Sequence, residues 1–215
     1  MIRALLVPAA LLALAYGAVW TLRPVSWTRS AIKTGATALL ALAALWAGLP
    51  GLALALALGA VGDWFLSRPH ATGFLPGLGA FALGHVVYLG VLWPLAGPPG
   101  LVPSAILFAV ALALMLSLWP RLGPLRLPVT AYTALSVALG LVALGLPAGA
   151  LALGLLAFIL SDIVLAVALF LLPEGHRAQP VLSRFLWALY WGGQAAILIG
   201  AIDVFSAIDG VSGIA

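Results

Sequence analysis

Long apolar runs separated by short breaks constrain this chain more than any other feature of its sequence. Such runs cover roughly residues 4–22, 34–49, 52–67, 73–93, 101–119, 127–146, 150–172 and 181–204. A helix of about 20 apolar residues can cross the hydrocarbon core of a bilayer. The runs are continuously apolar, whereas the strands of a membrane barrel alternate apolar and polar residues. We therefore predict an all-α, polytopic integral membrane bundle of eight transmembrane helices, forming a single domain over residues 1–215.

The composition narrows the class of protein further. Apolar residues make up 65% of the chain and charged residues 7%, whereas a soluble domain carries about 25% charged residues. This balance excludes an ordinary soluble domain, a disordered chain and a nucleic-acid-binding protein. The chain has no Cys and three His, which excludes disulfides, thiolate metal sites and a cysteine nucleophile. We therefore expect no cofactor and no metal.

The basic residues predict the orientation of the bundle. With eight crossings both termini lie on one side, and the loops after the first, third, fifth and seventh helices lie on the other. These four loops and their borders hold Arg23, Arg29, Lys33, Arg68, Arg121, Arg126, Arg177 and Arg184, and only Arg3 lies elsewhere. Because cytoplasmic loops are rich in Lys and Arg, we predict that both termini are external. The excess of Arg over Lys and of Ala, Gly and Leu suggests a bacterial cytoplasmic membrane.

Two carboxyl groups lie inside the predicted helices. Asp63 is near the end of the third helix, and Asp162 follows Ser161 within the seventh. A carboxylate at a helix centre costs about 2.5–3.5 kcal/mol on insertion scales, so such residues usually have a function. The third and seventh helices cross in the same direction, which suits a parallel four-plus-four repeat with the two aspartates facing each other. The alternatives are an ion pair of Asp63 with Lys33 or Arg68, and a structural hydrogen bond between helices for Asp162.

Other polar side chains lie at helical spacing. His85 and Tyr88 share a face of the fourth helix, and Tyr190 and Gln194 share a face of the eighth. At about 1.5 Å per residue, Asp63, His85 and Asp162 can all converge in the cytoplasmic half of the bundle. A structural histidine and simple helix–helix contacts of Tyr190 and Gln194 are the alternatives.

The segments that hold these residues resemble the YhhN family, which includes lysoplasmalogenases. The resemblance rests on GDWFL at 62–66, FLPGLGAF at 74–81, GHVVY at 84–88, GLLAFILSDIVLA at 154–166 and YWGGQ at 190–194. The chain departs from the family at two places. Thr34 follows Lys33 where the family usually has Pro, and Ala168-Leu169 stand where the family often has a polar or basic pair.

The resemblance implies an intramembrane hydrolase that cleaves the vinyl ether bond of a lysoplasmalogen to a fatty aldehyde and a glycerophospho-base. The lysophospholipid substrate and membrane lipids are then the expected partners. The family's two intramembrane aspartates, the proposed acid and base, match Asp63 and Asp162. His85 and Tyr88 would orient water or the headgroup, with Ser161, Tyr190 and Gln194 beside them. The substrate phosphate would lie against Lys33, Arg68 or Arg184.

The chemistry of a vinyl ether suits two carboxyl groups. Protonation of the outer alkene carbon gives an oxocarbenium ion, water adds, and the hemiacetal collapses to aldehyde and alcohol. This requires one neutral carboxylic acid and one carboxylate, as in glycosidases. Our hypothesis is that the deeper Asp162 is the acid and that Asp63, nearer water, is the base; the reverse assignment stays open.

Two other classes of function also fit the sequence. A small-molecule or proton-coupled transporter would use Asp63, His85 and Asp162 as a relay or substrate site. A lipid-binding scaffold would need neither carboxyl group for chemistry. The sequence indicates neither a headgroup preference nor an oligomeric state.

Overall fold

The regular structure of the described residues is helical throughout, which confirms the all-α prediction. The computed structural model describes residues 2–68, 70–147, 149–173 and 175–212. Its α-helices are α1 (Ile2–Ala15), α2 (Trp27–Trp46), α3 (Pro50–Leu66), α4 (His70–Leu92), α5 (Leu101–Leu122), α6 (Arg126–Gly145), α7 (Ala150–Ala166) and α8 (Gln179–Ser212). Two π-helical segments, η1 (Tyr16–Trp20) and η4 (Val167–Leu171), continue α1 and α7, and 3-10 turns η2 (Trp93–Leu95) and η3 (Gly123–Leu125) follow α4 and α5.

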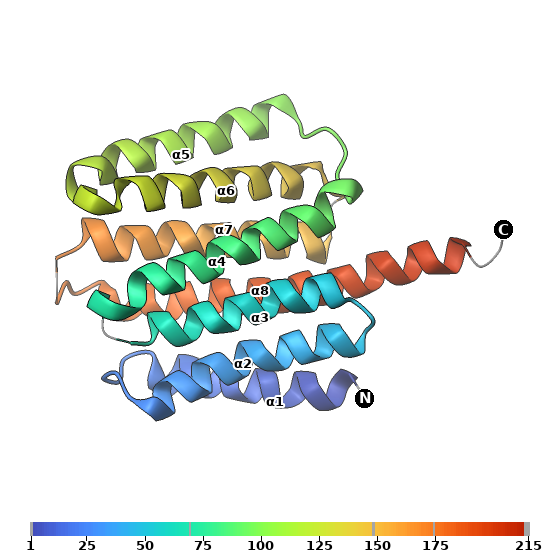
Figure 1. The fold of residues 1–215 in the computed structure, drawn as a ribbon, viewed down its shortest axis with the longest axis horizontal. Helices are drawn as coiled ribbons and strands as arrows, with labels where there is room; N and C mark the ends of the chain where they lie inside the picture. Colours follow the sequence, from blue (N-terminus) through green and yellow to red (C-terminus); the bar gives the residue numbers. More distant parts are fainter. Residues whose placement is uncertain (1, 69, 148, 174, 213–215) are drawn as a thin grey trace.

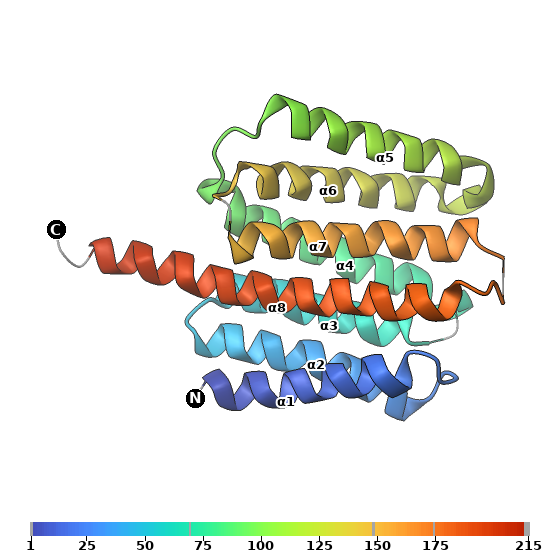
Figure 2. The same cartoon turned by 180° about the vertical axis from the view of Figure 1, so that it is seen from behind.

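Several helical segments are long and apolar enough to cross a membrane. Within the described residues there are five: Ile2–Trp20, Thr72–Leu95, Leu101–Gly145, Ala150–Leu171 and Gln179–Ile208. Leu101–Gly145 contains both α5 and α6, which lie side by side in Figures 1 and 2. Helix α3 is apolar but has 17 residues, and α2 is not among the five. The chain is therefore a helical membrane protein, while eight spans stay a prediction.

The predicted helix boundaries were wrong wherever polar residues begin or extend a helix. Helix α2 begins at Trp27 because the Ser26 side chain caps it, accepting a hydrogen bond from the Arg29 backbone N–H at 3.1 Å. Helix α5 continues to Leu122 with Pro120 inside it. Helix α8 covers Gln179–Ser212 and is longer at both ends than the apolar run at 181–204.

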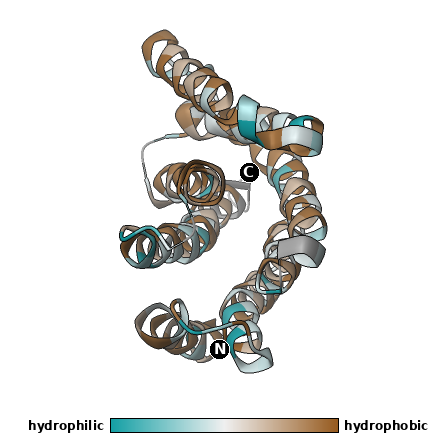
Figure 3. Cartoon of the chain, turned by 90° about the vertical axis from the view of Figure 1, so that its left-hand side faces the viewer, coloured by the Kyte–Doolittle hydropathy of each residue, from teal (hydrophilic) through white to brown (hydrophobic). Residues whose placement is uncertain are grey.

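The helices run alternately in opposite directions, so the connections alternate between the two ends of the molecule. In Figures 1 and 2 the loops after α1, α3, α5 and α7 lie at one end, and both termini lie at the other. The end with these four loops, here called the basic end, carries all but one of the chain's basic residues. Seen from this end, hydrophilic residues gather near the loops, while the helices are mainly hydrophobic (Figure 3).

Glycines let α7 and α8 approach closely enough for direct backbone contact. A Cβ on Gly154 would lie 2.6 Å from the Ile197 backbone N and 2.8 Å from the Gly193 carbonyl O. Real Cβ atoms do not approach backbone atoms so closely, so a side chain here would push the two helices apart. This contact also sets how Asp162 on α7 lies relative to Tyr190 on α8.

Replacement of Gly154 by Ala should therefore destabilise the bundle. Overpacking costs about 1–3 kcal/mol, and about 1 kcal/mol corresponds to a melting shift of about 2–4 °C in a domain of this size. We expect a lower Tm for Gly154→Ala in detergent. The control is Gly192→Ala, because nothing lies within 4 Å of a Cβ at Gly192. Equal melting temperatures of the two variants would contradict the close-contact argument.

Candidate active site

A polar cavity of about 360 Å³ opens between α2, α3, α4, α7 and α8. Its lining includes Thr21, Arg68 and Gln179, which lie beside the loops after α1, α3 and α7. The cavity therefore lies toward the basic end of the bundle. The charged residues that line it are Arg29, Lys33, Asp63, Arg68 and Asp162. Both predicted catalytic carboxyl groups thus face one cavity, together with three cations.

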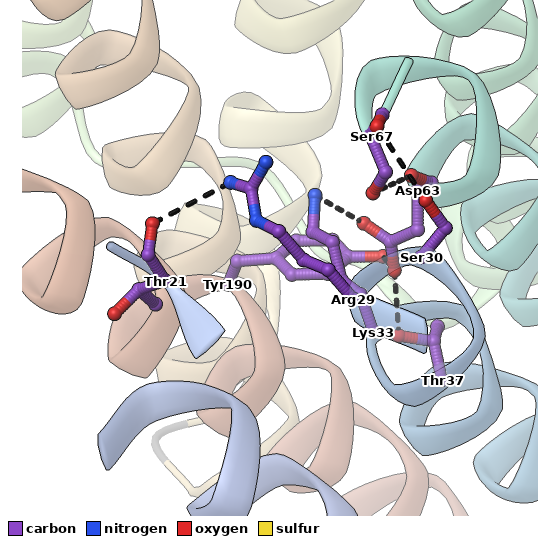
Figure 4. A network of polar contacts seen from close by, with 8 residues as sticks. All are labelled: Thr21, Arg29, Ser30, Lys33, Thr37, Asp63, Ser67 and Tyr190. Atoms are coloured by element: carbon purple, nitrogen blue, oxygen red, sulfur yellow. Dashed lines mark hydrogen bonds and ion pairs between the residues drawn. The ribbon is translucent and has the colours of Figure 1, made fainter. Parts of the chain in front are cut away.

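Asp63 is fully buried and is held by three donors from neighbouring helices. The Lys33 ammonium Nζ lies 3.0 Å from Asp63 Oδ1. The Thr37 hydroxyl donates to Oδ2 at 2.7 Å and the Tyr190 hydroxyl donates to the same oxygen at 2.9 Å. Figure 4 shows this network between α2, α3 and α8. Since all three partners are donors, the arrangement suits Asp63 in its carboxylate form.

Of the two cations that the sequence offered as ion-pair partners of Asp63, Lys33 is the one that forms the pair. Arg68 instead donates to the Ser30 hydroxyl and stacks over the rings of Trp27 and Trp64, at 4.1 and 4.6 Å from their centroids. Its guanidinium is thereby held at the cavity wall. Asp63 and Lys33 form a buried pair inside the bundle, with side-chain exposures of 0% and 12%.

Asp162 has different surroundings, set by α4 and α6. Its Oδ2 lies 3.4 Å from His85 Nε2, and the Tyr132 hydroxyl interacts with the same carboxyl group. The Asp162 side chain is 15% exposed, whereas that of Asp63 is 0% exposed. The expectation that Asp63 would lie nearer water is therefore wrong in terms of exposure, because Thr37 and Tyr190 cover it.

An apolar cavity of about 90 Å³ lies on the other side of Asp162, between α4, α5, α6 and α7. Its walls are mainly Leu, Val, Ile, Ala and Phe side chains. Six residues line both cavities, namely Leu66, Phe74, Phe81, Asp162, Leu165 and Leu169. Among the described residues, Asp162 is the one charged side chain that both cavities share. A molecule that occupied both would pass its carboxyl group.

The remaining predicted site residues separate into two groups. Ser161 and Tyr190 line the polar cavity. Tyr88 and Gln194 are buried and form a hydrogen bond from the Tyr88 hydroxyl to Gln194 Oε1, linking α4 to α8. Neither is among the residues that line the two cavities. Their geometry is that of a contact between helices, which was the alternative left open for Gln194.

The structure adds residues that the sequence reasoning missed. Arg29 and Thr37 lie one helical turn to either side of Lys33 on α2, and Tyr132 and Ser136 lie one turn apart on α6. Polar residues repeating at this spacing within apolar helices share a face. That spacing is the signal in the sequence that marks these residues. Among the described residues, no group of three His, Asp or Glu side chains could hold a metal ion.

The arrangement places ionisable side chains, which are usually solvated, around a cavity inside an apolar bundle. Asp63 is positioned as a carboxylate, Asp162 borders both a polar and an apolar cavity, and the cations Arg29 and Arg68 can meet an anion. Two carboxyl groups with different partners can hold different protonation states, which is the requirement for acid–base catalysis.

Comparison with known proteins identifies a matching family and two curated relatives. A profile of the YhhN family matches residues 28–201. Two curated proteins named "Lysoplasmalogenase", from Mycobacterium bovis (strain ATCC BAA-935 / AF2122/97) and Mycobacterium tuberculosis (strain CDC 1551 / Oshkosh), are each 35% identical over an alignment of 157 residues that covers 68% of this chain. The chain spans 58% of the length of these curated relatives. No solved structure matches it significantly.

The buried ion pair should show strong energetic coupling. Removing one partner of such a pair leaves an uncompensated charge and costs about 3–5 kcal/mol, whereas removing both costs far less. We expect Lys33→Met to lower Tm in detergent by about 10 °C and Lys33→Met/Asp63→Asn to recover most of that loss. A double variant whose destabilisation equals the sum of the two single effects would contradict the pairing.

Proposed function

The chain belongs to the YhhN family, and we propose that it is an intramembrane hydrolase that cleaves the vinyl ether bond of lysoplasmalogens. The products would be a fatty aldehyde and a glycerophospho-base. The name of the two mycobacterial relatives supports this proposal. The substrate class is a lysophospholipid with one alkenyl chain.

The observation that carries the proposal is the position of Asp162 between the two cavities. A lysoplasmalogen has a charged phosphate headgroup, one long apolar chain, and the vinyl ether bond at their junction. The polar cavity with its cations suits the headgroup, and the apolar cavity suits the start of the chain. With the substrate bound in this way, the vinyl ether lies beside the Asp162 carboxyl group.

The cations give the headgroup a binding surface. Arg29, Lys33 and Arg68 line the polar cavity, and guanidinium groups bind phosphate oxygens through two parallel donors. Lys33 forms an ion pair with Asp63, whereas Arg29 donates to the carbonyl oxygens of Trp20 and Thr21 and Arg68 donates to the Ser30 hydroxyl. Among the described residues neither guanidinium is paired with a carboxylate, so Arg29 and Arg68 are the principal phosphate ligands in our proposal. Arg184, which the sequence also offered, is exposed and is not among the residues that line this cavity.

In the proposed mechanism Asp162 is the acid and Asp63 the carboxylate. Asp162 donates its proton to the outer alkene carbon, whose π electrons form the new C–H bond, and an oxocarbenium ion results. The Asp63 carboxylate stabilises the cation and helps to activate the attacking water from the polar cavity. The hemiacetal then transfers its hydroxyl proton, through the site, to the glycerol oxygen, and the C–O bond breaks.

We propose the same membrane arrangement that the sequence predicts. All of α1 to α8 would cross the bilayer, with the basic end in the cytoplasm and both termini outside, in a bacterial cytoplasmic membrane. The parallel directions of α3 and α7 in Figure 1 support a four-plus-four repeat, as does the place of Asp63 and Asp162 near the same end of these two helices.

Replacement of Asp162 by Asn should abolish turnover without unfolding the protein. General acid catalysis contributes about 10²–10⁴-fold, so we expect aldehyde release from a vinyl-ether lysophospholipid to fall at least about 100-fold. The matched control is Asp203→Asn on α8, an exposed carboxyl that lines neither cavity. Full activity of a folded Asp162→Asn variant would contradict the proposed acid. Uptake of a solute into vesicles, without aldehyde release, would favour a transporter.

Replacement of Arg29 by Gln should weaken substrate binding more than chemistry. A hydrogen bond to a charged group is worth about 1.5–3 kcal/mol, so we expect KM to rise at least about tenfold with a smaller change in kcat. Arg121→Gln is the control, since Arg121 lies in the last turn of α5, beside a loop of the basic end, but lines neither cavity. Equal KM values for both variants would place the phosphate elsewhere.

A further inference from the structure

His85 is a buried titratable group that the mechanism above does not use. Its side chain is 0% exposed, and it is not among the residues that line either cavity. It therefore does not meet the substrate. Its ring packs between Tyr132 and Phe158, at centroid distances of 4.9 and 5.0 Å, which fixes its orientation.

The hydrogen bond at one ring nitrogen fixes the tautomer of His85. Its Nδ1 lies 2.9 Å from the carbonyl oxygen of Phe81. A carbonyl oxygen only accepts, so Nδ1 must carry a hydrogen and donate it. In the neutral ring, Nε2 is then a bare lone pair.

That lone pair faces the carboxyl group of Asp162. Nε2 lies 3.4 Å from Asp162 Oδ2 and 3.4 Å from the Ser136 hydroxyl. With no proton between Nε2 and Oδ2, a lone pair would face a carboxylate oxygen in an apolar bundle, which is unfavourable. With a proton on each, two donors would face each other. One proton between the two groups satisfies both.

We propose that His85 and Asp162 hold a single dissociable proton between them and that this proton is the one delivered to the substrate. The delivery of this proton to the substrate rests on the proposed function, whereas the sharing of the proton does not. His85 acts through Asp162 and is a positioning residue. Delivery leaves the Asp162 carboxylate beside the neutral imidazole, and the proton released by the attacking water restores the pair. The pair is unchanged after one turnover, and one water is consumed.

Other ionisable groups lie near the His85–Asp162 pair, on the helices packed around it. Tyr132 faces Asp162 and His85 from α6. Lys33 and Asp63 line the same polar cavity as Asp162 from α2 and α3, and Arg29 and Arg68 complete its charged lining. Lys33 and Asp63 are paired with each other, so His85 is the nitrogen base that lies next to Asp162.

Steady-state turnover tests the proposal. We expect His85→Gln and His85→Asn to lower kcat at least about tenfold with KM within about twofold, since His85 acts on the proton and not on substrate binding. The Asn variant keeps a donor for the Phe81 carbonyl while losing Nε2. The control is His176→Gln, since His176 lines neither cavity. A kcat within about twofold of the unaltered protein in both folded variants would overturn the proposal.

Nitrogen NMR of the purified protein in detergent tests the shared proton without any substrate. The chain has three His, and loss of one signal in the His85→Asn protein identifies His85. We expect its Nδ1 to be protonated and its Nε2 chemical shift to lie between those of a protonated and a bare ring nitrogen, and we expect that Nε2 shift to change in Asp162→Asn. An unaltered Nε2 shift in Asp162→Asn would refute the sharing. A shared proton in a protein that releases no aldehyde would refute the proposed function instead.

Discussion

The need to compensate charge inside an apolar bundle governs the rest of this structure. Breaking a buried ion pair by removing one partner costs several kcal/mol, so ionisable groups within a membrane bundle are found with partners. Here Asp63 is paired with Lys33 and Asp162 lies against His85. Each pair joins residues of different helices, so satisfying the charges also fixes how α2 meets α3 and how α4 meets α7.

The different partners of the two carboxyl groups give them different chemistry. Asp63 accepts from an ammonium and two hydroxyl groups, and its side chain is 0% exposed although it borders the polar cavity. Asp162 keeps some exposure, has a nitrogen base beside it, and borders both cavities. In the proposed reaction Asp63 is the fixed carboxylate and Asp162 is the carboxyl group that exchanges a proton. The proposed substrate is accordingly an amphiphile whose reactive bond lies at its polar–apolar junction, between the polar and the apolar cavity.

The sequence predicted the all-α class and the family correctly, because continuous apolar runs and the motifs around Asp63 and Asp162 are visible without a structure. The sequence analysis did not predict helix starts such as Trp27, because the N-cap at Ser26, and not hydrophobicity, determines where that helix begins. It placed Asp63 nearer water because distance along a helix ignores the side chains that cover it. It missed Arg29, Tyr132 and Ser136 because the sequence shows which residues share a helix face but not which face lines a cavity. The catalytic roles of Asp63 and Asp162 stay predictions.

The central claim is that an acid at the junction of the two cavities protonates the outer carbon of a vinyl ether. The most direct measurement is turnover of a vinyl-ether lysophospholipid in D₂O, with the aldehyde trapped at once and analysed by mass spectrometry. The account predicts one deuterium on the carbon next to the aldehyde carbon, which unlabelled aldehyde kept in the same buffer does not acquire. An aldehyde released without deuterium at that carbon would contradict it.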